Sequence, residues 1–190
     1  MPLAGKPGRA PTILESLVPF LHASFHSAGA AVAAVVTLPG QVLVSLGLIA
    51  VAGAVLFERG HAAAAVAWPA AWLATTAVEV LCKHLITRAP IDLNGVHATG
   101  FDSSWPSGHT LRCTLVAAAL VTAWPRLRAP LFAWLVAALV LLELAGFHTP
   151  TDVLGGLLLA TVAVSGVVEV ERSGLLRRGA ALRRARARAG

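Results

Sequence analysis

The sequence predicts an all-α polytopic membrane protein, built as a bundle of transmembrane helices. Hydrophobic residues make up 57% of the 190 residues and charged residues only 13%, so a water-soluble domain could not cover its surface with them. Apolar segments of spanning length recur along the chain, and short polar connections separate them. We expect five transmembrane helices, or six if the N-terminal apolar stretch also crosses, in a single domain over residues 1–190.

The N-terminal stretch, residues 12–37, is apolar but carries polar residues at regular intervals. Glu15, His22 and His26 are spaced so that they fall on one helical face. That pattern favours an amphipathic helix lying in the membrane interface, with a crossing as the alternative. Pro39-Gly40 then ends the stretch.

Five apolar segments follow, and each is long enough to be a membrane-crossing helix. They cover approximately residues 41–57, 64–86, 107–123, 131–147 and 153–170. Their connections are short except for the loop from Arg88 to Trp105, whose polar residues suit a lid or a reader of a lipid head group. In the last segment, Gly155 and Gly156 predict close packing between helices.

Basic residues set the predicted orientation. The formal net charge is +6, and seven of the 15 Lys and Arg residues lie between Arg172 and Arg188. Because cytoplasmic segments are enriched in Lys and Arg, this basic tail (residues 171–190) is predicted to be cytoplasmic and to bind anionic membrane lipids, as an interfacial helix or as a solvated tail. Nucleic acid is not expected as a partner of a chain otherwise suited to lipid. The protein is therefore expected in the cell membrane.

The two cysteines, Cys82 and Cys113, do not have the spacing of metal ligands. Both are expected near the same membrane face, so a disulfide is one interpretation. Burial as two small hydrophobic side chains is the other.

Three separate stretches are predicted to meet at the outer membrane face. They are Lys83 with Arg88, the sequence Pro-Ser-Gly-His at 106–109, and the stretch that begins with His148 and ends with Asp152. Ionisable residues at membrane depth are costly and are usually retained for function. We therefore expect these residues to form the functional site.

The middle stretch has the features of a helix N-terminus that binds an anion. Proline fits the first helical turn and serine caps it, so a helix is predicted to begin at Pro106 or Ser107. The backbone N–H groups of Ser107, Gly108 and His109 would then face an anion such as phosphate, and glycine would let it approach closely. The alternative is an ordinary capped helix start with an incidental histidine.

Histidines on two of the stretches suggest phosphoryl transfer. If a helix begins near Pro150, Asp152 can reach back to one ring nitrogen of His148 and leave the other nucleophilic. His109 could then protonate the leaving oxygen, while cations and N–H groups neutralise the phosphate oxygens.

With Pro-Ser-Gly-His at 106–109 and the pair His148 and Asp152 four residues apart, the chain resembles a member of the type 2 phosphatidic acid phosphatase family. These membrane lipid phosphatases share their site with vanadium haloperoxidases and glucose-6-phosphatase, and the resemblance covers approximately residues 13–170. It implies no metal and no cofactor. The residue roles that it implies are His148 as the nucleophile that forms a phosphohistidine, Asp152 as its orienting partner, His109 as the general acid, and Lys83, Ser107 and Gly108 as phosphate ligands.

Two arginines of the family pattern are displaced or absent. In the family, six residues separate the lysine of the first motif from an Arg-Pro pair. Here Arg88 lies five positions after Lys83, and Pro90 lies seven positions after Lys83. The family also has an arginine six residues before the nucleophile, where this chain has Leu142. Arg112 is a candidate substitute that would bind phosphate from a different helix. A structural pair between Arg112 and Glu143 is the alternative.

The expected function is hydrolysis of a phosphomonoester or diphosphate on a lipid or polyprenyl carrier at the outer membrane face. The alternative is a degenerate family member that binds lipid phosphate, or a membrane partner, without turnover. A haloperoxidase is not expected, because nothing in the composition would make the chain soluble.

Overall fold

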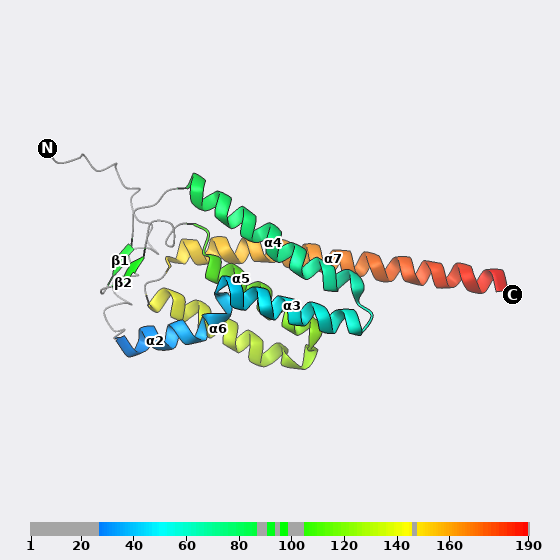
Figure 1. Cartoon of the computed structure of the whole chain (residues 1–190), viewed down its shortest axis with the longest axis horizontal. Helices are drawn as coiled ribbons and strands as arrows, with labels where there is room; N and C mark the ends of the chain where they lie inside the picture. The colour runs from blue at the N-terminus through cyan, green and yellow to red at the C-terminus, as the bar shows by residue number, and fades with distance from the viewer. Residues whose placement is uncertain (1–26, 87–90, 94–95, 99–104, 146–147, 190) are drawn as a thin grey trace.

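The computed structural model describes residues 27–86, 91–93, 96–98, 105–145 and 148–189. These residues form six α-helices, two short 3-10 helices and one two-stranded hairpin (Figure 1). The α-helices are α2 (Ser27–Val36), α3 (Val42–Glu58), α4 (Ala62–Leu85), α5 (Gly108–Ala123), α6 (Arg128–Leu144) and α7 (Pro150–Ala189). The 3-10 helices are η1 (Leu38–Gly40) and η2 (Pro125–Leu127), and the strands are β1 (Ile91–Leu93) and β2 (Val96–Ala98).

The predicted all-α membrane bundle is confirmed, because the described residues are almost entirely helical. The strands are confined to the long loop before α5, and they pair antiparallel with Ile91 opposite Ala98 and Leu93 opposite Val96. They flank the dipeptide Asn94-Gly95 in the sequence, a pair typical of two-residue hairpin turns. From the sequence this loop is expected to serve as a lid or head-group reader, and the hairpin within it was not predicted.

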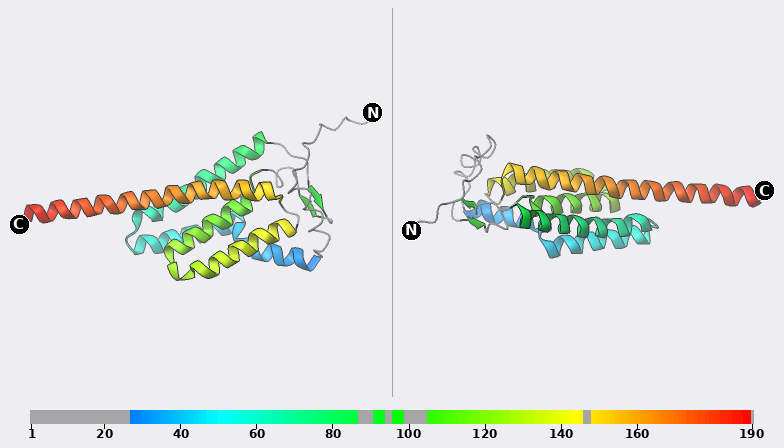
Figure 2. Two further views of the ribbon diagram at one scale, coloured as in Figure 1. Left: turned by 180° about the vertical axis from the view of Figure 1, so that it is seen from behind. Right: turned by 90° about the horizontal axis from the view of Figure 1, so that it is seen from above.

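Each predicted apolar segment corresponds to one helix, α3 to α7. The largest difference is at the end of α7, which continues through the basic tail for 40 residues in all. The tail is rich in Ala, Leu and Arg, which are strong helix formers, and it contains no proline that would end the helix. The tail is therefore a helical extension of α7 beyond the bundle (Figures 1 and 2).

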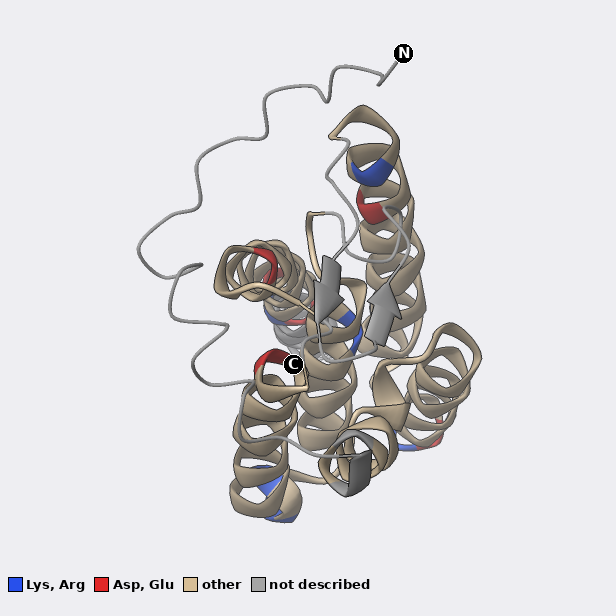
Figure 3. Cartoon of the chain, turned by 90° about the vertical axis from the view of Figure 1, so that its left-hand side faces the viewer, with Lys and Arg blue, Asp and Glu red and all other residues tan. Residues whose placement is uncertain are grey.

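The outer surface of the bundle is apolar, as a membrane protein requires. Large hydrophobic side chains such as Leu43 (81% exposed) and Val66 (70% exposed) point outward, and the helices carry few charged residues when viewed from the end with β1 and β2 (Figure 3). Within the described residues, three helical segments are long and apolar enough to cross a membrane: Ala62–Leu85, Pro125–Leu144 and Pro150–Gly174. Helices α3 and α5 are apolar but shorter, so the number of crossings stays a prediction.

Helix α5 lies at the centre of the bundle, where it packs against α3, α6, α7 and η1. Leu111 and Leu115 of α5 are almost fully buried and belong to one hydrophobic cluster with Trp68 and Ile49. Cys113 is also buried, Cys82 is half-buried, and both are free thiols. The disulfide considered from the sequence is therefore not formed.

The N-terminal segment packs onto this bundle through α2 and η1. The described part begins at Ser27, so the polar positions at Glu15, His22 and His26 lie outside the described residues. Trp134 of α6 donates its indole N–H to the carbonyl of Val36 at 3.0 Å. This bond holds the end of α2 against α6, and η1 follows at the first turn of α5.

Candidate active site

The start of α5 has the predicted cap. Ser107 is the N-cap residue, and its hydroxyl accepts a hydrogen bond from the backbone N–H of Thr110 at 3.2 Å. The helix itself begins at Gly108, one residue after the later of the two predicted starts, Pro106 and Ser107. The backbone N–H of Ser107 donates to the carbonyl of Asp152 at 3.0 Å, so the starts of α5 and α7 are joined directly.

The start of α7 is a capping box, which accounts for the position of Asp152. Its carboxylate oxygen Oδ2 accepts from the backbone N–H of Thr149 at 3.1 Å and from the Thr149 hydroxyl at 2.7 Å. The N–H of Asp152 in turn lies 3.4 Å from the Thr149 hydroxyl oxygen. This reciprocal pattern satisfies donors that a helix start would otherwise leave unpaired.

The hydrogen bond that we expected between Asp152 and His148 is not formed. Nδ1 of His148 is buried and has no hydrogen-bond partner among the described residues, because Oδ2 of Asp152 is directed to Thr149 instead. His109 and His148 do come together, as expected, with ring centroids 6.0 Å apart and planes inclined by 50°. The two histidines thus face each other across the starts of α5 and α7.

Burial makes His148 a neutral imidazole. Desolvation is the main cause that lowers the pKa of His148 from 6.5 to about 3, and the neighbouring His109, Lys83 and Arg112 lower it further. A side chain with this pKa is unprotonated at neutral pH, so its ring keeps a lone pair that can attack phosphorus.

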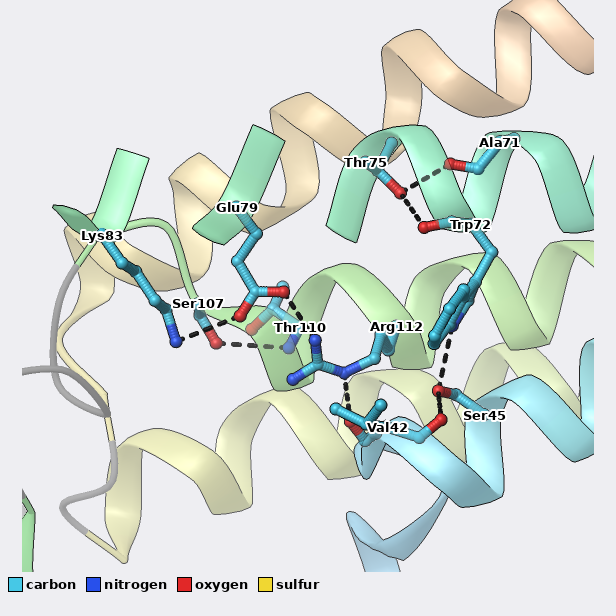
Figure 4. Close-up of polar contacts among 11 residues, drawn as sticks. Val42, Ser45, Ala71, Trp72, Thr75, Glu79, Lys83, Ser107, Thr110 and Arg112 are labelled. Atoms are coloured by element: carbon cyan, nitrogen blue, oxygen red, sulfur yellow. Dashed lines mark hydrogen bonds and ion pairs between the residues drawn. The ribbon is translucent and has the colours of Figure 1, made fainter. Parts of the chain in front are cut away.

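Lys83 and Arg112 both bind the carboxylate of Glu79 (Figure 4). The ammonium Nζ of Lys83 is 3.0 Å from Oε1 of Glu79, and Nη1 of Arg112 is 2.5 Å from Oε2. Glu79 and Lys83, four residues apart, thus form a helical ion pair within α4. The alternative pair of Arg112 with Glu143 is wrong, because α4 rather than α6 carries the carboxylate that reaches the guanidinium.

Glycine at position 108 leaves space for this carboxylate. A Cβ atom placed on Gly108 would overlap Oε1 of Glu79 and lie 2.5 Å from Nη2 of Arg112. From the sequence, Gly108 is expected to let an anion approach the helix start. In the structure the group that approaches is the carboxylate of Glu79.

Gly40 is a site neighbour that the sequence analysis did not identify. Its carbonyl accepts a hydrogen bond from Nε of Arg112 at 2.6 Å. A Cβ at this position would lie 3.0 Å from Cδ2 of His109 and 3.0 Å from the Cys113 sulfur. Pro39 and Gly40 thus belong to η1, which forms one wall of the site.

Two glycines of α7 allow it to approach the start of α5, as predicted. A Cβ on Gly155 would overlap the indole of Trp105, and a Cβ on Gly156 would lie 2.6 Å from the carbonyl oxygen of Ser107. The close approach at these two glycines sets the distance between the helix starts near which His109 and His148 lie.

Two further positions, Arg88 and Leu142, concern the phosphate-binding arginines of the family pattern. Arg88 lies outside the described residues, so its place relative to phosphate stays a prediction. Leu142, which stands where the family has an arginine, is 1% exposed and part of the apolar interior. Within the described site, Lys83 and Arg112 are thus the cations that the structure places beside the start of α5.

The fold and site together define a helical membrane protein in which paired histidines lie at the starts of two helices, beside two buried cations. The sequence model of the PAP2 superfamily matches residues 57–172, which is more than half of the chain. The protein belongs to the PAP2 superfamily, and this membership supports activity as a phosphatase. Gly40 lies outside the matched residues.

A known structure has the same fold. The crystal structure of Aquifex aeolicus LpxE superposes with a TM-score of 0.64 and 18% sequence identity, over 83% of this chain and 96% of that one. No curated protein gave a significant sequence match. At this identity the likeness shows the arrangement of the helices, and the residue roles depend on the geometry described above.

Proposed function

We propose that the protein is a membrane lipid phosphatase that hydrolyses a phosphomonoester or diphosphate on a lipid or polyprenyl carrier. The observation that carries this proposal is the pairing of His109 with His148 at 6.0 Å, beside the buried cations Lys83 and Arg112. Apolar helix surfaces surround the bundle, and a substrate that keeps its tail in lipid could present its phosphate at the end of such a bundle.

The reaction begins with attack of the neutral His148 imidazole on phosphorus. A nitrogen–phosphorus bond forms, the bond from phosphorus to the leaving oxygen breaks (the lipid oxygen of a monoester or the bridging oxygen of a diphosphate), and His109 gives that oxygen a proton. Lys83 and Arg112 stabilise the charge on the transferred phosphoryl group, together with the N–H groups at the start of α5. Water then attacks the phosphohistidine while His109 takes a proton from it, which releases phosphate and restores both histidines.

Arg112 takes the place of the arginine that is missing at Leu142. Arg112 is 6% exposed, so its charge is poorly screened and acts strongly on a nearby phosphate. Asp152 acts as a positioning residue, because its capping box fixes the backbone immediately after His148.

The site is proposed to face the outside of the cell membrane, with the basic end of α7 in the cytoplasm, where Lys and Arg are enriched. Anionic lipid head groups are the proposed partners of that end.

The test is phosphate release by purified protein in detergent from a panel of lipid phosphates and polyprenyl diphosphates. His148→Ala should lose activity by orders of magnitude, as should His109→Ala, because the two histidines act as a unit. His61→Ala is the matched control, since His61 pairs with Glu171 at 2.8 Å on segments remote from the site and should keep full activity. A wild-type protein that binds these lipids and never releases phosphate would instead be the degenerate family member.

A further inference from the structure

Glu79 occupies an unusual position for a carboxylate in a site that must bind phosphate. Its side chain is buried, as are those of Lys83 and Arg112, with 4%, 7% and 7% of the side chain exposed respectively. Each carboxylate oxygen binds one of the two cations. The carboxylate therefore engages both of the positive charges that the described residues supply to the phosphate pocket.

The carboxylate also lies against the start of α5. Oε1 of Glu79 fills the space that a side chain at position 108 would need, next to the end of the helix that favours negative charge. Two oxygens, two cations and a helix start match the contacts that a phosphoryl group would make in the same place. Glu79 thus has the position of a bound anion.

We propose that Glu79 is a resident counter-ion of the phosphate pocket. Before substrate binds, its carboxylate holds Lys83 and Arg112; the phosphoryl group displaces it, and its return to the cations helps to expel the product phosphate. This inference rests on the proposed function, because it assigns Glu79 to the same pocket. No covalent step is involved, and Glu79 acts only by competing for the two cations.

Burial explains why such a residue is needed. Two cations held close together in an apolar surrounding repel each other and are costly without an anion. Once a phosphate has bound there, the same cations would hold the product tightly unless another anion could replace it. A tethered carboxylate meets both requirements, because it neutralises the cations between turnovers and weakens the net affinity for phosphate.

A competing carboxylate and one that merely holds Lys83 and Arg112 in place predict opposite effects on anion binding. Glu79→Gln removes the competing charge but keeps the size of the side chain. It should bind orthovanadate and inorganic phosphate at least about tenfold more tightly than wild type, since one unit charge next to the ligand has been removed. KM and kcat should both fall, because substrate binds more easily and phosphate leaves more slowly.

The measurement is calorimetric titration of the full-length protein in detergent with orthovanadate and with phosphate, together with thermal unfolding. Without ligand, Glu79→Gln should unfold at a lower temperature than wild type. Vanadate should remove this difference, because it replaces the missing negative charge. Glu79→Asp, which keeps the charge but shortens the reach, should show a smaller gain in affinity. Glu171→Gln, in the exposed pair with His61, is the matched control and should bind both anions as wild type does.

Equal or weaker vanadate binding by folded Glu79→Gln would overturn the inference and leave Glu79 as a holder of the cations. If Glu79→Gln does not fold, the same result for Glu79→Asp decides the question. A wild-type protein that binds vanadate but releases phosphate from no lipid would refute the proposed function alone, because anion binding would still report on the pocket.

Discussion

Replacing Gly156 by alanine tests how closely the two helix starts must approach. The added Cβ would lie 2.6 Å from the carbonyl oxygen of Ser107, 2.9 Å from Cβ of Thr110 and 3.2 Å from the backbone nitrogen of Leu111. Two of these atoms belong to the backbone and cannot rotate away. Because ordinary contact begins at 3.4 Å, α7 and the start of α5 must separate by about 0.8 Å, the difference between 3.4 and 2.6 Å.

That displacement acts directly on the proposed chemistry. α7 follows His148, α5 carries His109, and the two rings already lie 6.0 Å apart. A misplacement of about 1 Å between reacting groups can cost about 100-fold in rate, whereas overpacking of this kind costs about 1–3 kcal/mol of stability. We therefore expect Gly156→Ala to remain folded in detergent but to lose about 100-fold in kcat, measured as phosphate release.

Gly166→Ala is the control, because it makes the same chemical change on the same helix. A Cβ at position 166 would meet no atom within 4 Å, so activity should be unchanged and thermal stability equal or slightly higher. Wild-type turnover by Gly156→Ala would refute the reasoning, since it would mean that the helix starts need not be held at this separation.

Three further predictions follow from the site and the topology. As the pH falls from 7 to 5, His148 gains a proton in the unfolded chain near pH 6.5 but not in the folded protein, where its pKa is about 3. Thermal melts should therefore show about 2 kcal/mol of stability lost by pH 5. His148→Gln should remove that part of the loss. Arg112→Leu should lower kcat/KM by about 100-fold or more, and adding Leu142→Arg should restore turnover if the pocket keeps the family geometry; full activity of Arg112→Leu would exclude its role. In intact cells, a cysteine at Gly95 should react with an impermeant reagent and one at Gly174 should not, and the reverse pattern would invert the topology.

The parts of the site that the sequence predicted are those fixed by local interactions. Capping by Ser107 involves Thr110, three residues away, and α7 begins at Pro150, where proline suits the first helical turn. Hydrophobic composition and proline positions determine where such helices begin and end, which is why α3 to α7 appear where the sequence placed them.

The parts that it missed depend on packing between distant elements. Arg112 is separated by 33 residues from Glu79 and by 72 from Gly40, and the sequence does not determine which of several carboxylates will face it. Glu143 was the alternative partner considered for Arg112, whereas Glu79 takes that place in the structure. Depth follows from counting residues along each helix, but the rotation of one helix relative to another follows from the fit of side chains in the core.

The length of α7 has a consequence for where the reaction takes place. From Asp152 to Gly174 the helix rises about 33 Å at about 1.5 Å per residue, close to the roughly 30 Å thickness of the hydrocarbon layer of a membrane. The same unbroken helix then continues to Ala189, with arginines that favour the head-group region. Because the helix is continuous, the basic end of α7 would set how deep His148, at its other end, lies below the opposite membrane surface. One residue inserted along the span would shift that height by about 1.5 Å and turn the helix by about 100°.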